Sequence, residues 1–136
     1  MSYVIAYGAA FLVFGIIDLL WLSLMGPVLY MPVLKEVLAP TIRIAPAIAF
    51  YLMYPVGIVA FGALPALRAE SVVVGMASAL LLGALAYGTY DLTNFATLKV
   101  WSLPITLMDI AYGAAASAIA AAAAFYAVRQ IGRAHV

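Results

Sequence analysis

Four long apolar stretches alternate with short polar ones along the chain, at about 3–25, 44–67, 71–94 and 103–128. A helix needs about 20 residues to cross the roughly 30 Å hydrocarbon core of a bilayer, at about 1.5 Å per residue, and each stretch is long enough. Together they use most of the chain and leave no room for a soluble domain. We therefore predict an all-α integral membrane protein, a single up-down bundle of four transmembrane helices over residues 1–136.

The composition agrees with this pattern. The chain is 69% hydrophobic and 8% charged, whereas soluble domains are about 45–50% apolar and about 25% charged. The net charge of +1 provides no attraction for nucleic acid. The expected partner is the lipid bilayer, and no nucleic-acid partner is expected.

Prolines interrupt the pattern at two places. Gly26–Pro27 predicts the end of the first helix, because proline disfavours the helical conformation of the residue before it. The following segment, 27–43, is too short to span and forms either a short amphipathic segment at the interface or a plain ordered loop. Pro55 falls inside the second helix, where it predicts a kink and a free carbonyl acceptor at Tyr51.

The basic residues give little information on orientation. One side of the predicted bundle carries both termini with Arg68, Arg129 and Arg133, and the other carries Lys35, Arg43 and Lys99. Because the two sides have equal numbers, the positive-inside rule does not decide between them. The two arginines of the C-terminal tail favour cytoplasmic termini.

The residue types exclude several kinds of chemistry. The chain has no cysteine, so disulfides and thiolate catalysis are excluded, and His135 is its single histidine. Haem held by two intramembrane histidines and a histidine-rich zinc site are excluded as well. We expect no metal and no cofactor, although a carboxylate-only Mg²⁺ site across three helices stays open as an alternative.

Three aspartates, Asp18, Asp91 and Asp109, lie inside or at the rim of the apolar stretches. Each costs about 2.5–3.5 kcal/mol near the centre of a membrane helix, so each needs a reason to be there. Counted along their helices, they lie within about 5–10 Å of the side that bears the loops 26–43 and 95–102. This predicts a one-sided pocket that opens toward these two loops.

Polar and aromatic residues follow the same helical faces as the aspartates. The third helix carries Tyr87, Tyr90, Asp91 and Asn94 at i, i+3, i+4 and i+7, which is the spacing of one face. The predicted ligand- or proton-binding pocket consists of Asp18, Trp21, Tyr51, Tyr54, Tyr87, Tyr90, Asp91, Asn94, Lys99, Asp109 and Tyr112, with Phe14 in its aromatic wall. Lys99 and Arg43 are the expected counter-charges. In the alternative interpretation they pair with the aspartates only to fix helix packing.

Four motifs resemble one family. They are Asp18–Leu22 (DLLWL), Phe50–Gly57 (FYLMYPVG), Tyr87–Trp101 (YGTYDLTNFATLKVW) and Asp109–Gly113 (DIAYG). Together they are similar to the small bacterial membrane proteins called domain of unknown function 2177. The resemblance implies a multi-pass protein of the bacterial inner (cytoplasmic) membrane with four helices, and it implies no particular activity.

Three functions fit these features, and we favour the first. A binding or transport protein would hold a small polar, cationic or amphipathic ligand in the pocket, with or without proton coupling through Asp18 and Asp109, and would use a homodimer for a full translocation path. A lipid- or isoprenoid-modifying enzyme would use paired carboxylates as acid and base. A structural or accessory subunit would use the alanine-rich face of 114–124 to pack on a partner.

Overall fold

The computed structural model describes residues 2–134, which form helices and no strand. The elements are α1 (Ser2–Met25), the π-helix η1 (Gly26–Tyr30), α2 (Met31–Leu34), α3 (Ile44–Ile58), the π-helix η2 (Val59–Ala63), α4 (Leu64–Ala69), α5 (Val72–Thr97) and α6 (Leu103–Ala134). They join into four helices, Ser2–Leu34, Ile44–Ala69, Val72–Thr97 and Leu103–Gly132, each long and apolar enough to cross a membrane. The predicted four-helix membrane bundle is confirmed, while the prediction on His135 lies outside the described residues.

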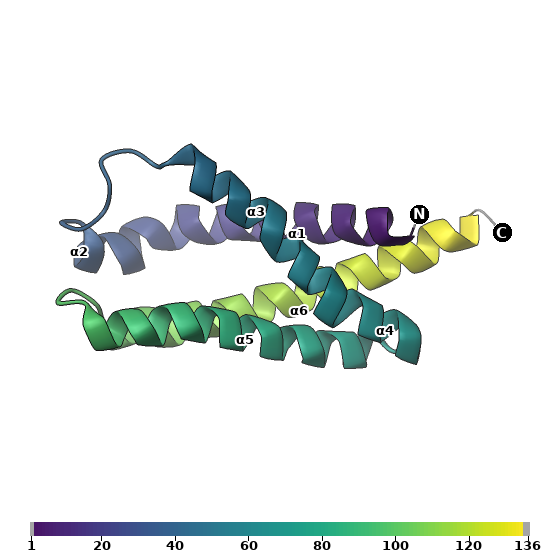
Figure 1. The fold of residues 1–136 in the computed structure, drawn as a ribbon. Helices are drawn as coiled ribbons and strands as arrows, with labels where there is room; N and C mark the ends of the chain where they lie inside the picture. The colour runs from purple at the N-terminus through teal and green to yellow at the C-terminus, as the bar shows by residue number, and fades with distance from the viewer. Residues whose placement is uncertain (1, 135–136) are drawn as a thin grey trace.

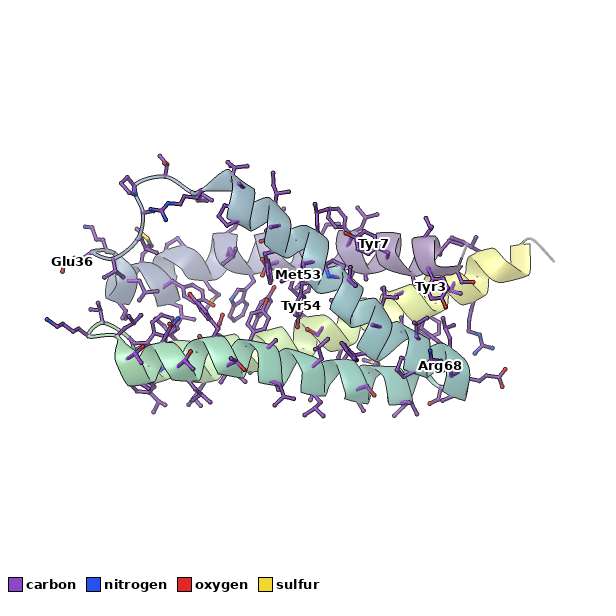
Figure 2. All side chains as sticks on the ribbon, viewed as in Figure 1. Tyr3, Tyr7, Glu36, Met53, Tyr54 and Arg68 are labelled. Carbon is purple, nitrogen blue, oxygen red and sulfur yellow. The ribbon has the colours of Figure 1, made fainter. Side chains whose placement is uncertain are left out.

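The four helices run up and down in turn (Figure 1). Both termini lie at one end, and the loops 35–43 and 98–102 lie at the other. α6 packs most extensively along α5 and next along α1, while α3 and α4 cross the bundle diagonally. Figure 2 shows Tyr3 and Arg68 at the end with the termini and Glu36 at the opposite end.

The first helix is longer than predicted. It continues through Pro27 as η1 and ends at Leu34, so the predicted end at Gly26–Pro27 is wrong. Met25 keeps helical angles (φ −94°, ψ −18°), and the N–H of Met31 donates to the carbonyl of Gly26, five residues back. The wider π turn includes the position that lacks an N–H, and in this way the chain stays helical past the proline. Of the segment 27–43, only the part after Leu34 is turn and loop.

The second helix also contains a proline and a π-helix. Pro55 lies inside α3, and η2 begins four residues later, where the N–H of Leu64 donates to the carbonyl of Val59. The carbonyl of this helix that accepts a side-chain donor is that of Leu52, whereas the free acceptor was expected at Tyr51. The Tyr7 hydroxyl donates to the carbonyl of Leu52 at 2.8 Å, which ties α3 to α1.

Small residues bring η2, α5 and α6 close together. A Cβ at Gly83 would lie 2.7 Å from Ser117 Oγ, and one at Gly62 would lie 2.8 Å from the Cβ of Ala121. Within 114–124 the buried alanines are Ala114, Ala116, Ala118, Ala120, Ala121 and Ala124. The alanine-rich face therefore packs inside its own chain, so it no longer favours an accessory subunit.

The turn between α4 and α5 has a strained residue. Glu70 is left-handed (φ 52°, ψ 38°) and is the one non-glycine residue with positive φ among the described residues. The N–H of Ser71 donates to the carbonyl of Ala66 at 3.0 Å, and the N–H of Glu70 to that of Leu67 at 3.3 Å. This is the Schellman ending of a helix, in which glycine usually takes the left-handed position.

We predict that Glu70→Gly stabilises the protein. Glycine removes the steric cost of the left-handed conformation, about 1 kcal/mol, and leaves both turn hydrogen bonds in place. The free energy of unfolding in mixed detergent–SDS micelles should rise accordingly. Ala69→Gly is the control, since it lies in the helical turn before and should lower stability by up to about 1 kcal/mol. A loss of stability in both variants would contradict the prediction.

Candidate functional site

Asp18 lies inside the bundle and is held by two tyrosines. The residue is 6% exposed, and its carboxylate accepts hydrogen bonds from the hydroxyls of Tyr51 on α3 and Tyr112 on α6, the latter at 2.6 Å. A hydrogen bond to a charged group contributes about 1.5–3 kcal/mol. Two such bonds match or exceed the cost of about 2.5–3.5 kcal/mol for an aspartate in a membrane helix. Asp18 therefore needs no basic partner, and it joins three helices.

Asp109 is held by a residue that the sequence analysis missed. Asp109 is 7% exposed, and its carboxylate accepts a hydrogen bond from the hydroxyl of Tyr30 of η1 at 2.5 Å. The Tyr30 hydroxyl in turn accepts one from the indole N–H of Trp21 at 2.9 Å. Tyr30 was assigned to the segment 27–43, an interfacial amphipathic segment or a loop, because the first helix was predicted to end at Gly26–Pro27. Only a first helix that continues past Pro27 would have placed Tyr30 at the bundle, and the sequence pattern did not predict one.

The two held carboxylates are linked through an aromatic bridge. The ring of Trp21 stacks on the ring of Tyr112, with centroids 4.4 Å apart and an interplanar angle of 11°. Trp21 thus contacts the donor of Asp18 with its face and the donor of Asp109 with its N–H. Both tyrosines therefore contact the same indole.

Asp91 differs from the other two aspartates. It is 0% exposed, and both of its carboxylate oxygens lack a hydrogen-bond partner. Among the described side chains, these two oxygens are the only buried polar atoms without a hydrogen-bond partner. The carboxyl faces Asp109 closely enough for the two groups to interact electrostatically, and it also interacts with Tyr30. A buried polar group without a partner marks a site whose function needs an explanation.

Counted along their own helices, Asp91 and Asp109 are equally far from the loop end, and Asp18 is further from it. Asp91 and Asp109 are each six residues from the loop end of their helices, about 9 Å at 1.5 Å per residue. Asp18 bonds to Tyr112, which is one helical turn deeper than Asp109 on α6. The predicted common depth assumed a first helix that ends near residue 25. Because that helix runs to Leu34, Asp18 lies further from the loop side than expected.

An aromatic layer lies beneath the Asp18 carboxylate. Tyr54 is buried at the centre of the bundle (Figure 2), and its hydroxyl bonds to Ser117 Oγ at 2.7 Å. Since Ser117 donates its own proton to the carbonyl of Gly113, Tyr54 is the donor. The ring of Tyr87 makes edge contacts with the rings of Tyr54 and Tyr112, at 6.1 and 5.9 Å. These predicted residues come together in the structure as one cluster.

Four other predicted residues lie at the rim or outside the cluster. Tyr90 is 58% exposed and contacts Trp101 edge to face, and Asn94 is half-buried. Lys99 and Arg43 are exposed in the loops. The hydrogen bonds that reach Asp18 and Asp109 come from tyrosines and not from these cations. The expected ion pairs are thus replaced by phenol–carboxylate bonds, which keep the donors inside the bundle.

A groove lies beside the cluster, between α1 and α3. It encloses about 360 Å³ and is lined by apolar side chains of both helices together with Gly15 and Tyr51. Leu12, Ile16 and Leu19 on its edge are more than half exposed, as is typical of side chains that face lipid. This groove opens sideways, between two helices, whereas the predicted pocket opens toward the loops. Tyr51 belongs to both the groove and the Asp18 site.

The family comparison covers the whole of this site. The model of the family described as "Predicted membrane protein (DUF2177)" matches residues 3–126. The chain belongs to this family. The match confirms the resemblance seen in the four motifs and includes all three aspartates and the tyrosines that donate to Asp18 and Asp109. No curated protein and no solved structure matches the chain.

The DUF2177 cluster offers few ligands for a metal ion. Within residues that the structure describes, no three histidine, cysteine, aspartate or glutamate side chains come together as a metal site. The Asp18 carboxylate already accepts hydrogen bonds from two tyrosines. It also lies apart from the other two aspartates, Asp91 and Asp109, which pair with each other. The alternative of a carboxylate-only Mg²⁺ site gains no support from this geometry.

We predict that Gly113→Ala disrupts the aromatic layer. A Cβ at position 113 would overlap the ring of Tyr87, 2.7 Å from its Cδ2 atom. Overpacking of this kind costs about 1–3 kcal/mol, measurable as a lower free energy of unfolding in detergent–SDS micelles. Gly88→Ala is the matched control, because its Cβ would lie 3.9 Å from Ile110 Cδ1, an ordinary contact. Equal stability of the two variants would show that Tyr87 does not occupy this position.

Proposed function

We propose that the protein binds an amphipathic ligand with a hydrocarbon chain and a basic amine head group, taken laterally from the bilayer. One observation carries the proposal: Tyr51 forms part of the apolar groove and also donates to the buried carboxylate of Asp18. A site for a chain and a site for a cation are therefore separated by a single side chain. The proposal places the protein in the bacterial inner membrane, with cytoplasmic termini, and takes that bilayer as the ligand source.

The groove suits a hydrocarbon chain. Its volume of about 360 Å³ falls in the range of ligand pockets, about 300–1,000 Å³. The residues that line it are apolar apart from the Tyr51 hydroxyl, and that hydroxyl donates to the carboxylate of Asp18, which is not part of the lining. Because the edge is formed by lipid-facing leucines and isoleucines, a chain enters without crossing a polar surface.

The Asp18 site suits a protonated amine. Its two present donors are neutral phenols, and a charged donor forms a hydrogen bond about twice as strong. An ammonium group that takes the place of the Tyr51 hydroxyl would keep the bond from Tyr112. The aromatic rings of Trp21 and Tyr112 next to Asp18 add a favourable surface for a cation. An anionic or neutral head group gains none of these contacts.

The other functions gain less support. An acid–base pair needs both carboxyls within hydrogen-bond reach of the same bound substrate. Asp18 and Asp109 are instead separated by Tyr112, Trp21 and Tyr30, and the pair formed with Asp91 is buried away from the groove. Transport of the ligand across the membrane would extend the same binding site, with a second copy of the chain completing the path.

Binding of a long-chain amine tests the proposal. Dodecylamine should bind the protein in lipid nanodiscs and change the fluorescence of Trp21, which contacts Tyr112. Dodecanol and dodecanoate are the matched probes with the same chain and should bind at least about tenfold more weakly, equivalent to 1.4 kcal/mol. Asp18→Asn should reduce the affinity for the amine to that for the alcohol. Equal affinity for all three probes would contradict the proposal.

Two glycines of α1 provide a matched pair of variants for the groove. No atom lies within 4 Å of a Cβ at Gly15 or at Gly8, so both positions have room for a larger side chain. Gly15 lines the groove and Gly8 does not. Gly15→Leu should therefore fill the groove and abolish binding of dodecylamine, whereas Gly8→Leu should bind like the wild type. Undiminished binding by Gly15→Leu would exclude this groove as the ligand site.

A further inference from the structure

We infer that Asp91 of α5 and Asp109 of α6 form a second site, a carboxyl pair that binds one exchangeable proton inside the bundle. The inference goes beyond the proposed function, because neither the groove nor the Asp18 site uses Asp91. It also stands without that function, since a proton is bound whether or not an amphiphile is present.

The burial of Asp91 is the first reason. Its side chain is 0% exposed, so water does not reach its two oxygens, and neither oxygen has a hydrogen-bond donor. A charged carboxylate in that position would have neither water nor a hydrogen bond to stabilise it, which is strongly disfavoured. Some cation must therefore be bound there, and a proton is the one that needs no additional space.

The groups that face Asp91 give the second reason. They are Asp109 from α6, Tyr30 from η1 and Tyr90 from its own helix. None of the three is basic, and the Tyr30 proton is already donated to Asp109. Lys35 and Lys99, in the nearby loops, are exposed. Since no basic side chain among the described residues faces it, Asp91 takes part in a hydrogen bond only if one carboxyl carries a proton and donates it to the other, as in other paired carboxyls.

The position of the pair allows the proton to exchange. Both carboxyls lie about 9 Å from the loop ends of α5 and α6, on the side where Tyr90 is exposed at the rim. Tyr30, which holds Asp109, belongs to a π-helix, a local widening that is frequent at functional sites. Asp18 has no comparable need for a proton, because two tyrosines donate to it.

Infrared spectroscopy of the ligand-free protein in nanodiscs tests the inference. The wild type at neutral pH should show the carbonyl stretching band of one protonated carboxylic acid, shifted by H/D exchange. Asp91→Asn should remove this band, and Asp18→Asn should retain it. A wild type without the band, or a band that persists in Asp91→Asn, would overturn the inference. No amphiphile is added, so a failure here is distinct from a failure of the amine-binding proposal.

Stability of the same variants gives a second, independent result. Asparagine at position 91 mimics the protonated acid, since its amide N–H replaces the hydroxyl that donates to Asp109. Asp91→Asn should therefore fold and melt within a few degrees of the wild type. A variant that fails to fold would show that a charged Asp91 is needed instead. A wild type that is stabilised by NaCl but not by the same concentration of choline chloride would show that the pair binds a sodium ion instead of a proton.

Discussion

The structure depends on phenol hydroxyls that donate to a buried carboxylate. α3 makes few backbone contacts with α1 and α6, and crosses them at an angle. The bonds from Tyr51 and Tyr112 to Asp18 join these three helices at one point. In a hydrocarbon environment the carboxylate cannot find a better partner in solvent, so the three helices are held in the arrangement that supplies its donors.

The two halves of the bundle pack by different means. α5 and α6 approach closely through glycine and alanine, with no space between them for a ligand. α1 and α3 meet through aromatic rings and leucines, and their larger side chains leave a groove on the outer face. The polar cluster lies where these two kinds of packing meet. Asp109 and Tyr112 belong to the tight half, while Tyr51 of the looser half lines the groove.

Much of this was predictable from periodicity. The four spans, the helical face shared by Tyr87 and Asp91, and Ser102 at the start of α6, which accepts from the N–H of Ile105, follow from local rules. The role of Tyr30 was not predictable in this way, because the preference against helix before proline is weak enough for a π turn to override it. Tyr51 and Tyr112 were predicted in the same pocket as Asp18, but their role as its donors was not assigned. Basic residues were expected from charge alone, whereas three-dimensional packing decided that tyrosines reach the carboxylates.

The coupling between Asp18 and Tyr112 tests this account most directly. A double-mutant cycle of Asp18→Asn and Tyr112→Phe, measured by reversible unfolding in mixed micelles, should give an interaction free energy of about 1.5 kcal/mol or more. Tyr126, which is 52% exposed, provides the control, and its Phe variant should show no coupling to Asp18. Additive effects of Asp18→Asn and Tyr112→Phe, within about 0.5 kcal/mol, would mean that the carboxylate is not held by this tyrosine and would contradict the account.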